Sequence, residues 1–278
     1  MHDGGLVIPT ERPEAIASVF ERMGEQALDR CYSLAGYLGD SGNEVLASAG
    51  LYDPTKGTFS RTGSLAIARS WPNAILLQNG RVLVEGGYSP NGGTDAAELY
   101  DPATGLFSPA GSTGAARIHD MVTLLPDGRV LLTGGASVTG NESDDAAIAT
   151  SAMLYDPVSA KFTATGSMTY GRLGHTSTVL RDGRVLIVGG FERFGYPIFA
   201  LVAEIFDPGI GKFSPAASLA VPTVSHTATL LPDGRVLIAG GYKLSSTDPS
   251  AAAEIYDPNG TPLAAPSISG RALSTPGA

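Results

Sequence analysis

The sequence predicts an all-β fold built as a radial array of small four-stranded antiparallel sheets, a β-propeller of about five blades. One motif recurs along the chain: Asp or Asn followed by Gly-Arg-Val-Leu, a few small or apolar residues, Gly-Gly, a variable gap, Tyr-Asp-Pro and then Phe. The aspartates of the Asp-Pro pairs stand at 53, 101, 156, 207 and 257, so successive copies lie 48, 55, 51 and 50 residues apart. Strand-like repeats of this length are typical of propellers.

The composition agrees with one domain of short strands and tight turns. The 278 residues include 36 Gly and 19 Pro, and only 16% are charged. The net charge of −9 argues against a nucleic-acid partner, and no 18-residue apolar run is present that could span a membrane. Cys31 is the only cysteine, which excludes an internal disulfide. We expect a monomer without cofactor or metal.

Each repeat divides into four strands. In the copy that begins at His226, residues 226–231 form the first strand, 236–239 the second and 253–256 the third. The Asp-Gly or Asn-Gly pair between the first two strands predicts a type I′ hairpin, which requires positive φ at its centre. A fourth strand begins after Asp-Pro, and Pro109 and Pro215 fall in it. Because proline lacks a ladder donor, this strand is predicted to lie at the outer edge.

The aromatic residues near Asp-Pro are predicted to be buried between neighbouring blades, because each blade must cover the apolar face of the next. Truncating such a phenylalanine is expected to cost roughly 3–5 kcal/mol. The residues concerned are Tyr52, Tyr100 and Tyr155 with Phe59, Phe107, Phe162 and Phe213.

The two ends of the chain depart from the repeat. Residues 1–29 are predicted to be a helical or irregular extension, with helical spacing over 13–28, and 30–278 to be the propeller. Residues 30–36 read as a degraded second strand without the expected first strand, so the first blade is incomplete. Gly270-Arg271 begins a further copy. Two interpretations remain: a truncated array, or a ring closed by 271–278 pairing beside 30–36.

The repeat resembles the kelch repeat, in which a Gly-Gly doublet is followed by Tyr, six residues and an aromatic. Tyr52–Phe59, Tyr100–Phe107, Tyr155–Phe162 and Phe206–Phe213 keep this spacing, with Phe where kelch repeats usually carry Trp. The sequence of these repeats is similar to that of bacterial kelch proteins grouped with the galactose oxidase central domain. The resemblance covers roughly 30–270 and implies the fold. It leaves function open, since kelch propellers serve as enzymes, sugar binders and interaction modules.

Candidate ligand-binding residues lie in the connections between blades and in the loops after the second strands, which share one face. Arginine recurs ten residues before the turn Asp or Asn in three copies, and Thr223 replaces it in the next. Histidine recurs three residues later in two copies. Together with aromatic residues of the same face, the candidate site comprises Arg69, Trp71, Arg117, His119, Arg172, His175, His226, Phe194 and Tyr196.

Clustered guanidinium groups require a counter-charge, so an acidic peptide or acidic sugar is the partner class these arginines favour. In kelch domains that bind acidic peptides, arginines at similar positions line the pocket around the central channel, so the kelch resemblance implies that these residues ring the mouth of the channel here. The structural interpretation is that the Arg and His side chains bond main-chain carbonyls of the neighbouring blade. Trp71 either stacks on a ligand or fills a blade junction.

Three functions fit the sequence. The first is a non-catalytic propeller that binds a protein or a carbohydrate. The second is a sugar-active enzyme related to galactose oxidase or to sugar mutarotases, although the resemblance would then imply copper held by two Tyr and two His with a Cys–Tyr bond, and no matching His pair accompanies Cys31. The third is a structural array within a larger surface protein. Residues 1–30 lack a signal-peptide pattern, and an extracellular or periplasmic parent protein stays open.

Overall fold

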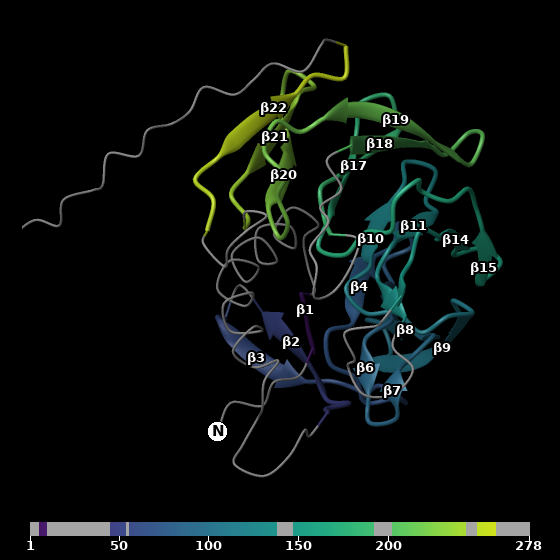
Figure 1. The fold of residues 1–278 in the computed structure, drawn as a ribbon. Coiled ribbons are helices and arrows are strands. Elements are labelled where there is room, and N and C mark those ends of the chain that lie inside the picture. Colours follow the sequence, from purple (N-terminus) through teal and green to yellow (C-terminus); the bar gives the residue numbers. More distant parts are fainter. Residues whose placement is uncertain are drawn as a thin grey trace, which may run out of the picture. The chain divides into compact units, whose positions relative to one another are not determined.

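The computed structural model describes residues 6–9, 45–53, 56–137, 147–191, 202–242 and 249–259. Every regular element within these ranges is a β-strand (Figure 1). This confirms the all-β class. Among these residues the search for a helix that is long and apolar enough to cross a membrane finds none. The segments 13–28, 30–36 and 271–278, for which the sequence predicts a helix, a strand and a closing tail, lie outside the described residues.

Three of the sheets contain four strands in the order first, second, third, fourth. Sheet 2 is formed by β4 (Asn73–Leu76), β5 (Val82–Glu85), β8 (Ala96–Asp101) and β9 (Leu106–Ser112). Sheet 3 is formed by β10 (Met121–Leu124), β11 (Val130–Thr133), β14 (Ala152–Asp156) and β15 (Lys161–Ala164). Sheet 4 is formed by β16 (Thr176–Val179), β17 (Val185–Val188), β18 (Val202–Asp207) and β19 (Lys212–Ser218). All pairs in sheets 2 and 4 are antiparallel.

Two further sheets show three strands among the described residues, and two short hairpins extend the loops after second strands. Sheet 5 is formed by β20 (Thr227–Leu230), β21 (Val236–Ala239) and β22 (Ala253–Tyr256). Sheet 1 is formed by β1 (Leu6–Pro9), β2 (Ala49–Asp53) and β3 (Thr58–Arg61). The hairpins pair β6 (Tyr88–Ser89) with β7 (Gly92–Gly93), and β12 (Ala136–Ser137) with β13 (Ala147–Ile148).

Sheet 1 differs from the others because β1 runs parallel to β2. The register places Leu6 opposite Ala49 and Pro9 opposite Tyr52. The N-terminal extension, predicted to be helical or irregular, therefore contributes a strand to this sheet, where the antiparallel repeat would place a second strand.

The chain divides into two compact units. Unit 1 comprises Met1–Ile118, Ser137–Ser143 and Asp156–Phe162, and it contains sheets 1 and 2. Unit 2 comprises His119–Ala136, Asp144–Tyr155 and Thr163–Ala278, and it contains sheets 4 and 5 together with β10 and β11.

Consecutive sheets within a unit share an apolar core. In unit 1, Leu51 of sheet 1 packs against a cluster that contains Val82, Val84 and Tyr100 of sheet 2. In unit 2, one cluster joins sheets 3 and 4 and another joins sheets 4 and 5. The second strands β5, β11 and β17 are buried at all four positions. Since alternate side chains point to opposite faces, both faces of these strands are covered.

The hairpins between first and second strands are not of the predicted type I′. Gly128 has φ +87°, but Asp127 before it does not enter the positive-φ region. Gly128 N–H donates to Leu125 O at 2.9 Å, and Leu125 N–H donates to Arg129 O at 2.8 Å. This is a three-residue loop in which a type I turn is followed by a left-handed glycine. The prediction was wrong because an Asp-Gly pair is compatible both with a two-residue type I′ turn and with this three-residue loop.

The prediction that the fourth strand is an edge strand is confirmed. Strands β9 and β19 lie at the sheet edges and contain Pro109 and Pro215. The pairing register shifts next to each proline, at Glu98 opposite Pro109 and at Glu204 opposite Pro215. A proline and a bulge both make an edge unfit for pairing with another strand.

Burial of the aromatic residues follows the prediction only in part. Tyr100, Tyr155 and Phe206 are fully buried, but Phe59 is 60% exposed, and Phe107, Phe162 and Phe213 are half-buried. Within sheets 1, 2 and 4 the two aromatic residues face each other across the third and fourth strands, with ring centroids 4.8–4.9 Å apart. The third-strand ring enters the core, while the fourth-strand ring covers it from the edge.

We therefore expect Tyr100→Ala to lower the free energy of unfolding by about 3–5 kcal/mol, because it empties a filled core position. Phe59→Ala should cost less than about 1 kcal/mol, since most of this side chain is already in water. Urea unfolding of both variants measures the difference. Equal losses would contradict the assignment of the anchor to the third strand.

The Asp-Pro turns supply a second stability test. Gly57, Gly105 and Gly211 hold φ between +64° and +69° at one turn position, where sheet 3 has Ala160 at φ +52°. Replacing Ala160 with Gly should raise the free energy of unfolding by about 0.5–1 kcal/mol, because a Cβ is strained in the left-handed region. The reciprocal Gly57→Ala should cost about 1 kcal/mol, since no atom lies within 4 Å of the added Cβ. Thermal melts of the two variants should move in opposite directions.

Candidate functional site

The antiparallel strand order gives each sheet two different ends. The hairpin between first and second strands and the Asp-Pro turn lie at one end, which we call the turn end. The connection that enters the first strand and the loop that follows the second strand lie at the other, the loop end. All the described candidate residues belong to loop ends.

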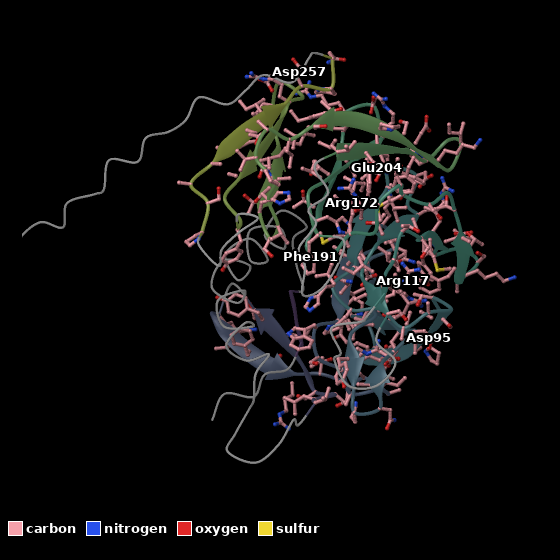
Figure 2. All side chains as sticks on the ribbon, in the orientation of Figure 1. Asp95, Arg117, Arg172, Phe191, Glu204 and Asp257 are labelled. Atoms are coloured by element: carbon pink, nitrogen blue, oxygen red, sulfur yellow. The ribbon has the colours of Figure 1, made fainter. Side chains whose placement is uncertain are left out.

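Arg172, on the connection that enters sheet 4, is fully buried and held inside its own sheet (Figure 2). Its guanidinium forms an ion pair with Glu204 at 3.0 Å and donates to Gly189 O at 2.8 Å and to Val202 O. Glu204 is 1% exposed. The counter-charge for this arginine therefore comes from the third strand.

Arg69 repeats this arrangement in sheet 2. Its guanidinium lies 2.8 Å from Glu98 and donates to Gly86 O at 3.1 Å and to Ala96 O at 2.7 Å. Burial lowers the pKa of Arg69, which the carboxylate of Glu98 opposes. Both arginines thus bond the first glycine of the doublet, the start of the third strand and a glutamate within that strand.

The glutamate also holds the connection that precedes its sheet. Its carboxylate accepts main-chain N–H groups two or three residues before the arginine position. One side chain, buried in sheets 2 and 4 and half-buried in sheet 5, therefore joins the connection to the third strand. The acceptors and donors are Glu98 with Ala66 and Ile67 at 2.8 and 3.3 Å, Glu204 with Thr169 at 2.8 Å, and Glu254 with Ala220 and Val221 at 2.8 and 2.7 Å.

Two sheets lack one member of the pair. In sheet 3, Arg117 is 5% exposed and Met153 occupies the glutamate position. In sheet 5, Glu254 is present and Thr223 occupies the arginine position, where its hydroxyl donates to Gly240 O at 2.9 Å. The arginine and the glutamate therefore occur together only in sheets 2 and 4.

His175 and His226 lie between consecutive sheets of unit 2 and are 2% and 6% exposed. His175 Nε2 is 2.9 Å from Thr133 Oγ1 of sheet 3, and His226 Nε2 is 2.8 Å from Thr176 Oγ1 of sheet 4. Burial lowers the pKa of His226 to about 4. Burial, assisted by the charge of Arg172, lowers the pKa of His175 to about 3. Both rings are therefore neutral at neutral pH.

The residue two positions after the arginine is the more accessible one. His119 and Ser225 are exposed there, and Trp71 and Gly174 are half-buried. All four have left-handed φ, at +50° for Trp71, +55° for His119, +67° for Gly174 and +54° for Ser225. This backbone is favourable only for glycine, yet three other residue types occupy it.

A second loop-end position escaped the sequence analysis. The residue after Gly-Gly forms an antiparallel bridge to the residue after the arginine position, and it is aromatic in three sheets. Its two main-chain hydrogen bonds in sheet 2 measure 2.8 Å each. The bridges are Ser70 with Tyr88, Leu173 with Phe191 and Val224 with Tyr242. The recurrence of an aromatic residue after Gly-Gly was the available signal. Phe194 and Tyr196 lie outside the described residues.

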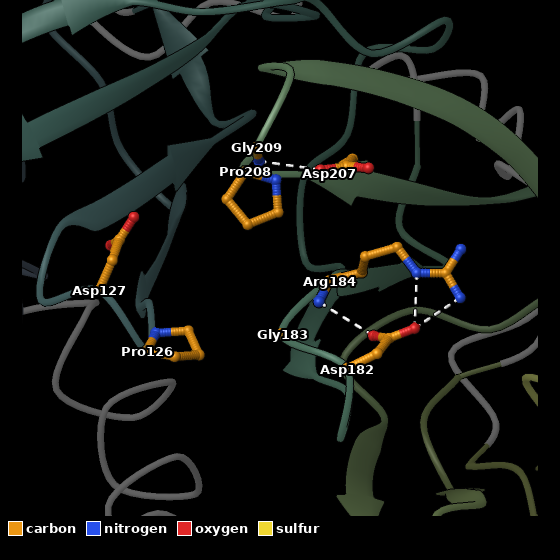
Figure 3. A pocket seen from close by; sticks show the side chains of 8 residues that line it. All are labelled: Pro126, Asp127, Asp182, Gly183, Arg184, Asp207, Pro208 and Gly209. Carbon is orange, nitrogen blue, oxygen red and sulfur yellow. Dashed lines mark hydrogen bonds and ion pairs between the residues drawn. The ribbon is translucent and has the colours of Figure 1, made fainter.

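The turn end of unit 2 contains a pocket of about 460 Å³ (Figure 3). Arg184 donates from its main-chain N–H to Asp182 Oδ1 at 3.1 Å and from Nε to Oδ2 at 2.7 Å. The hydrogen bond from Arg184 holds the pKa of Asp182 below its usual range. The lining residues are Pro126, Asp127, Asp182, Gly183, Arg184, Asp207, Pro208 and Gly209.

The copper implied by the galactose oxidase resemblance does not fit the residues that the structure describes. Among them, no group of three or more His, Cys, Asp or Glu side chains could hold a metal ion. One nitrogen of each buried histidine is engaged by a threonine hydroxyl, and Cys31 lies outside the described residues.

No family model and no curated protein matches the chain. Among solved structures, the chain is similar to a novel fungal alcohol oxidase of the AA5 family in complex with copper, with a TM-score of 0.46 and 18% identity over 73% of this chain. The chain spans 55% of the length of that protein. At this similarity, neither the copper nor the oxidation of alcohols carries over to this chain.

The ion pair in sheet 4 can be tested against the residues that other sheets carry. Glu204→Met should lower the free energy of unfolding by about 3–5 kcal/mol, because it leaves Arg172 buried without a counter-charge. Adding Arg172→Thr should recover part of this loss, since Met153 and Thr223 stand at these two positions elsewhere. Chemical unfolding of the wild type, the two single variants and the double variant gives the coupling energy.

The matched control is Glu254→Met, which removes the main-chain contacts without stranding an arginine. We expect a smaller loss than for Glu204→Met. Additive effects of Arg172→Thr and Glu204→Met would show that the two side chains do not act as a pair.

Proposed function

We propose that the chain is a kelch-type β-propeller that binds a protein or carbohydrate ligand at its loop ends without chemical turnover. The fold part of this proposal is supported by the recurrence of one sheet design. Sheets 2, 3 and 4 share one strand order, and the same main-chain bond recurs after each. It runs from the second glycine to the arginine or threonine position of the next copy: Gly87 to Arg117, Gly135 to Arg172 and Gly190 to Thr223.

The observation that carries the binding proposal is the contrast between constant and variable loop-end positions. In sheets 2 and 4 the arginine, glutamate and glycine positions are buried and bond mainly to one another, so they fix the path of the loop. The position that follows is Trp71, His119, Gly174 or Ser225, with more access to solvent. Variable side chains on a rigid frame are typical of recognition surfaces.

The structure changes the argument about ligand charge. The sequence favoured an acidic ligand because clustered arginines need an anion. Glu98 and Glu204 supply that charge for Arg69 and Arg172 from inside the protein. These arginines therefore belong to the loop frame, and we assign ligand contact separately in each unit: to Trp71 at the loop ends of unit 1, or to His119 at those of unit 2.

A screen of glycan and peptide arrays with the whole chain identifies a ligand, and titration then measures its affinity. Trp71→Ala and His119→Ala are titrated as separate variants, and at least one of them should weaken binding at least tenfold, because each removes the largest accessible side chain of this position in its own unit. Val158→Ala is the control, since this residue is 94% exposed at a turn end. Undiminished affinity of both folded variants would contradict the assignment.

The alternative is a sugar-active enzyme that uses a side chain as acid or base. His119 is the exposed member of the three described candidate histidines. Conversion of a bound sugar can be monitored by NMR of its anomers or by the release of peroxide. If the wild type converts the sugar and His119→Gln does not, the enzyme proposal replaces the binding proposal.

A further inference from the structure

We propose that His175 and His226 form an acid-sensitive latch, which fastens the loop ends of sheets 4 and 5 to the preceding sheets and opens when the rings take up protons. Each junction is closed by two bonds. A glycine N–H donates to the main chain of the following connection, at 2.9 Å for Gly135 and 3.1 Å for Gly190. A histidine on that connection then bonds a threonine of the preceding sheet.

A second N–H on either ring would have no hydrogen-bond acceptor among the described residues. The Nδ1 atoms of His175 and His226 are buried and have no hydrogen-bond partner among the described residues. A neutral imidazole has one N–H and one lone pair, so the threonine hydroxyl can serve either tautomer. An imidazolium has two N–H groups, and the second would be buried without an acceptor.

The charges around the rings oppose protonation as well. The charges of Arg172 and His226 lower the pKa of His175. The nearby acid Glu204 already forms an ion pair with Arg172. A second cation beside the Arg172–Glu204 pair would lack a carboxylate of its own. For His226, burial is the cause that lowers the pKa.

The rings are also wedged against main chain. A Cβ on Gly134 would lie 2.8 Å from His175 Cε1, and one on Gly189 would lie 2.6 Å from His226 Cε1. With glycine backbone this close, a charged ring has little room to turn within the closed junction. Release of the connection toward water is the way to solvate it.

The direction of the pH effect follows from the pKa values. The pKa of each histidine is lowered in the folded state to about 3 and about 4, against about 6.5 in an unfolded chain. The latch therefore stabilises fully above about pH 6.5 and weakens as the pH falls toward 4. Because each junction takes up one proton on opening, its closing equilibrium constant falls up to about tenfold per pH unit.

Hydrogen exchange of the Gly135 and Gly190 amides, expressed as protection factors between pH 7 and 4.5, measures the opening. Wild-type protection should fall steeply as the pH decreases. His175→Gln/His226→Gln, which keeps a side-chain amide near each threonine but cannot titrate, should flatten both profiles. Each single variant should flatten the profile of its own junction, Gly135 for His175→Gln and Gly190 for His226→Gln. His119→Gln is the control, because this histidine is exposed.

Flat wild-type protection, or an unchanged slope in the double variant, would overturn the latch. If the double variant does not fold, the NMR titration of the wild-type histidine rings decides the question. Rings that titrate near pH 6.5 in the folded chain would exclude the proposal, and rings that stay neutral down to about pH 4.5 would support it.

Discussion

The loop ends depend on a glutamate that sits in the third strand and faces the connection before its own sheet. In sheets 2, 4 and 5 this carboxylate accepts main-chain N–H groups of that connection, and in sheets 2 and 4 it also pairs with the arginine. A buried carboxylate is stable only when its oxygens are satisfied. The requirement works in both directions: the connection satisfies the glutamate, and the glutamate fixes the connection.

The regular part of the fold was predictable because it follows from local chemistry. Asp-Gly and Asp-Pro mark the turns, and Pro109 and Pro215 identify the edge strand by the donor they lack. The hairpin type was not predictable, since a left-handed glycine serves two turns. The parallel β1 was missed because residues 6–9 carry no trace of the repeat, and strand partners far apart in sequence leave no local signal.

The candidate site was predictable as a set of positions but not as an environment. Arg69 and Arg172 were recognised by repetition, but their partners Glu98 and Glu204 lie 29 and 32 residues further along the chain. Comparison of the repeats within the chain indicates that the arginine and the glutamate belong together. Sheet 3 has Met153 at the glutamate position, and sheet 5 has Thr223 at the arginine position. Repetition alone cannot separate a binding arginine from a structural one, because both recur.

The residue two positions after the arginine, which directly follows the bridged residue, has left-handed backbone dihedral angles. This conformation bears on the proposed function. Glycine would relieve the strain at Trp71, His119 and Ser225 at no steric cost, and Gly174 shows that the frame accepts it. A side chain there is retained against a local cost of roughly 1–2 kcal/mol. Each of these loops is fixed by its own contacts: Glu98 holds the connection with Trp71, the bond from Gly87 to Arg117 holds the one with His119, and Glu254, the bond from Gly190 to Thr223 and the His226–Thr176 contact hold the one with Ser225. Strained, variable and accessible side chains on a fixed loop frame are typical of recognition surfaces, and this supports the proposal that a ligand binds at the loop ends.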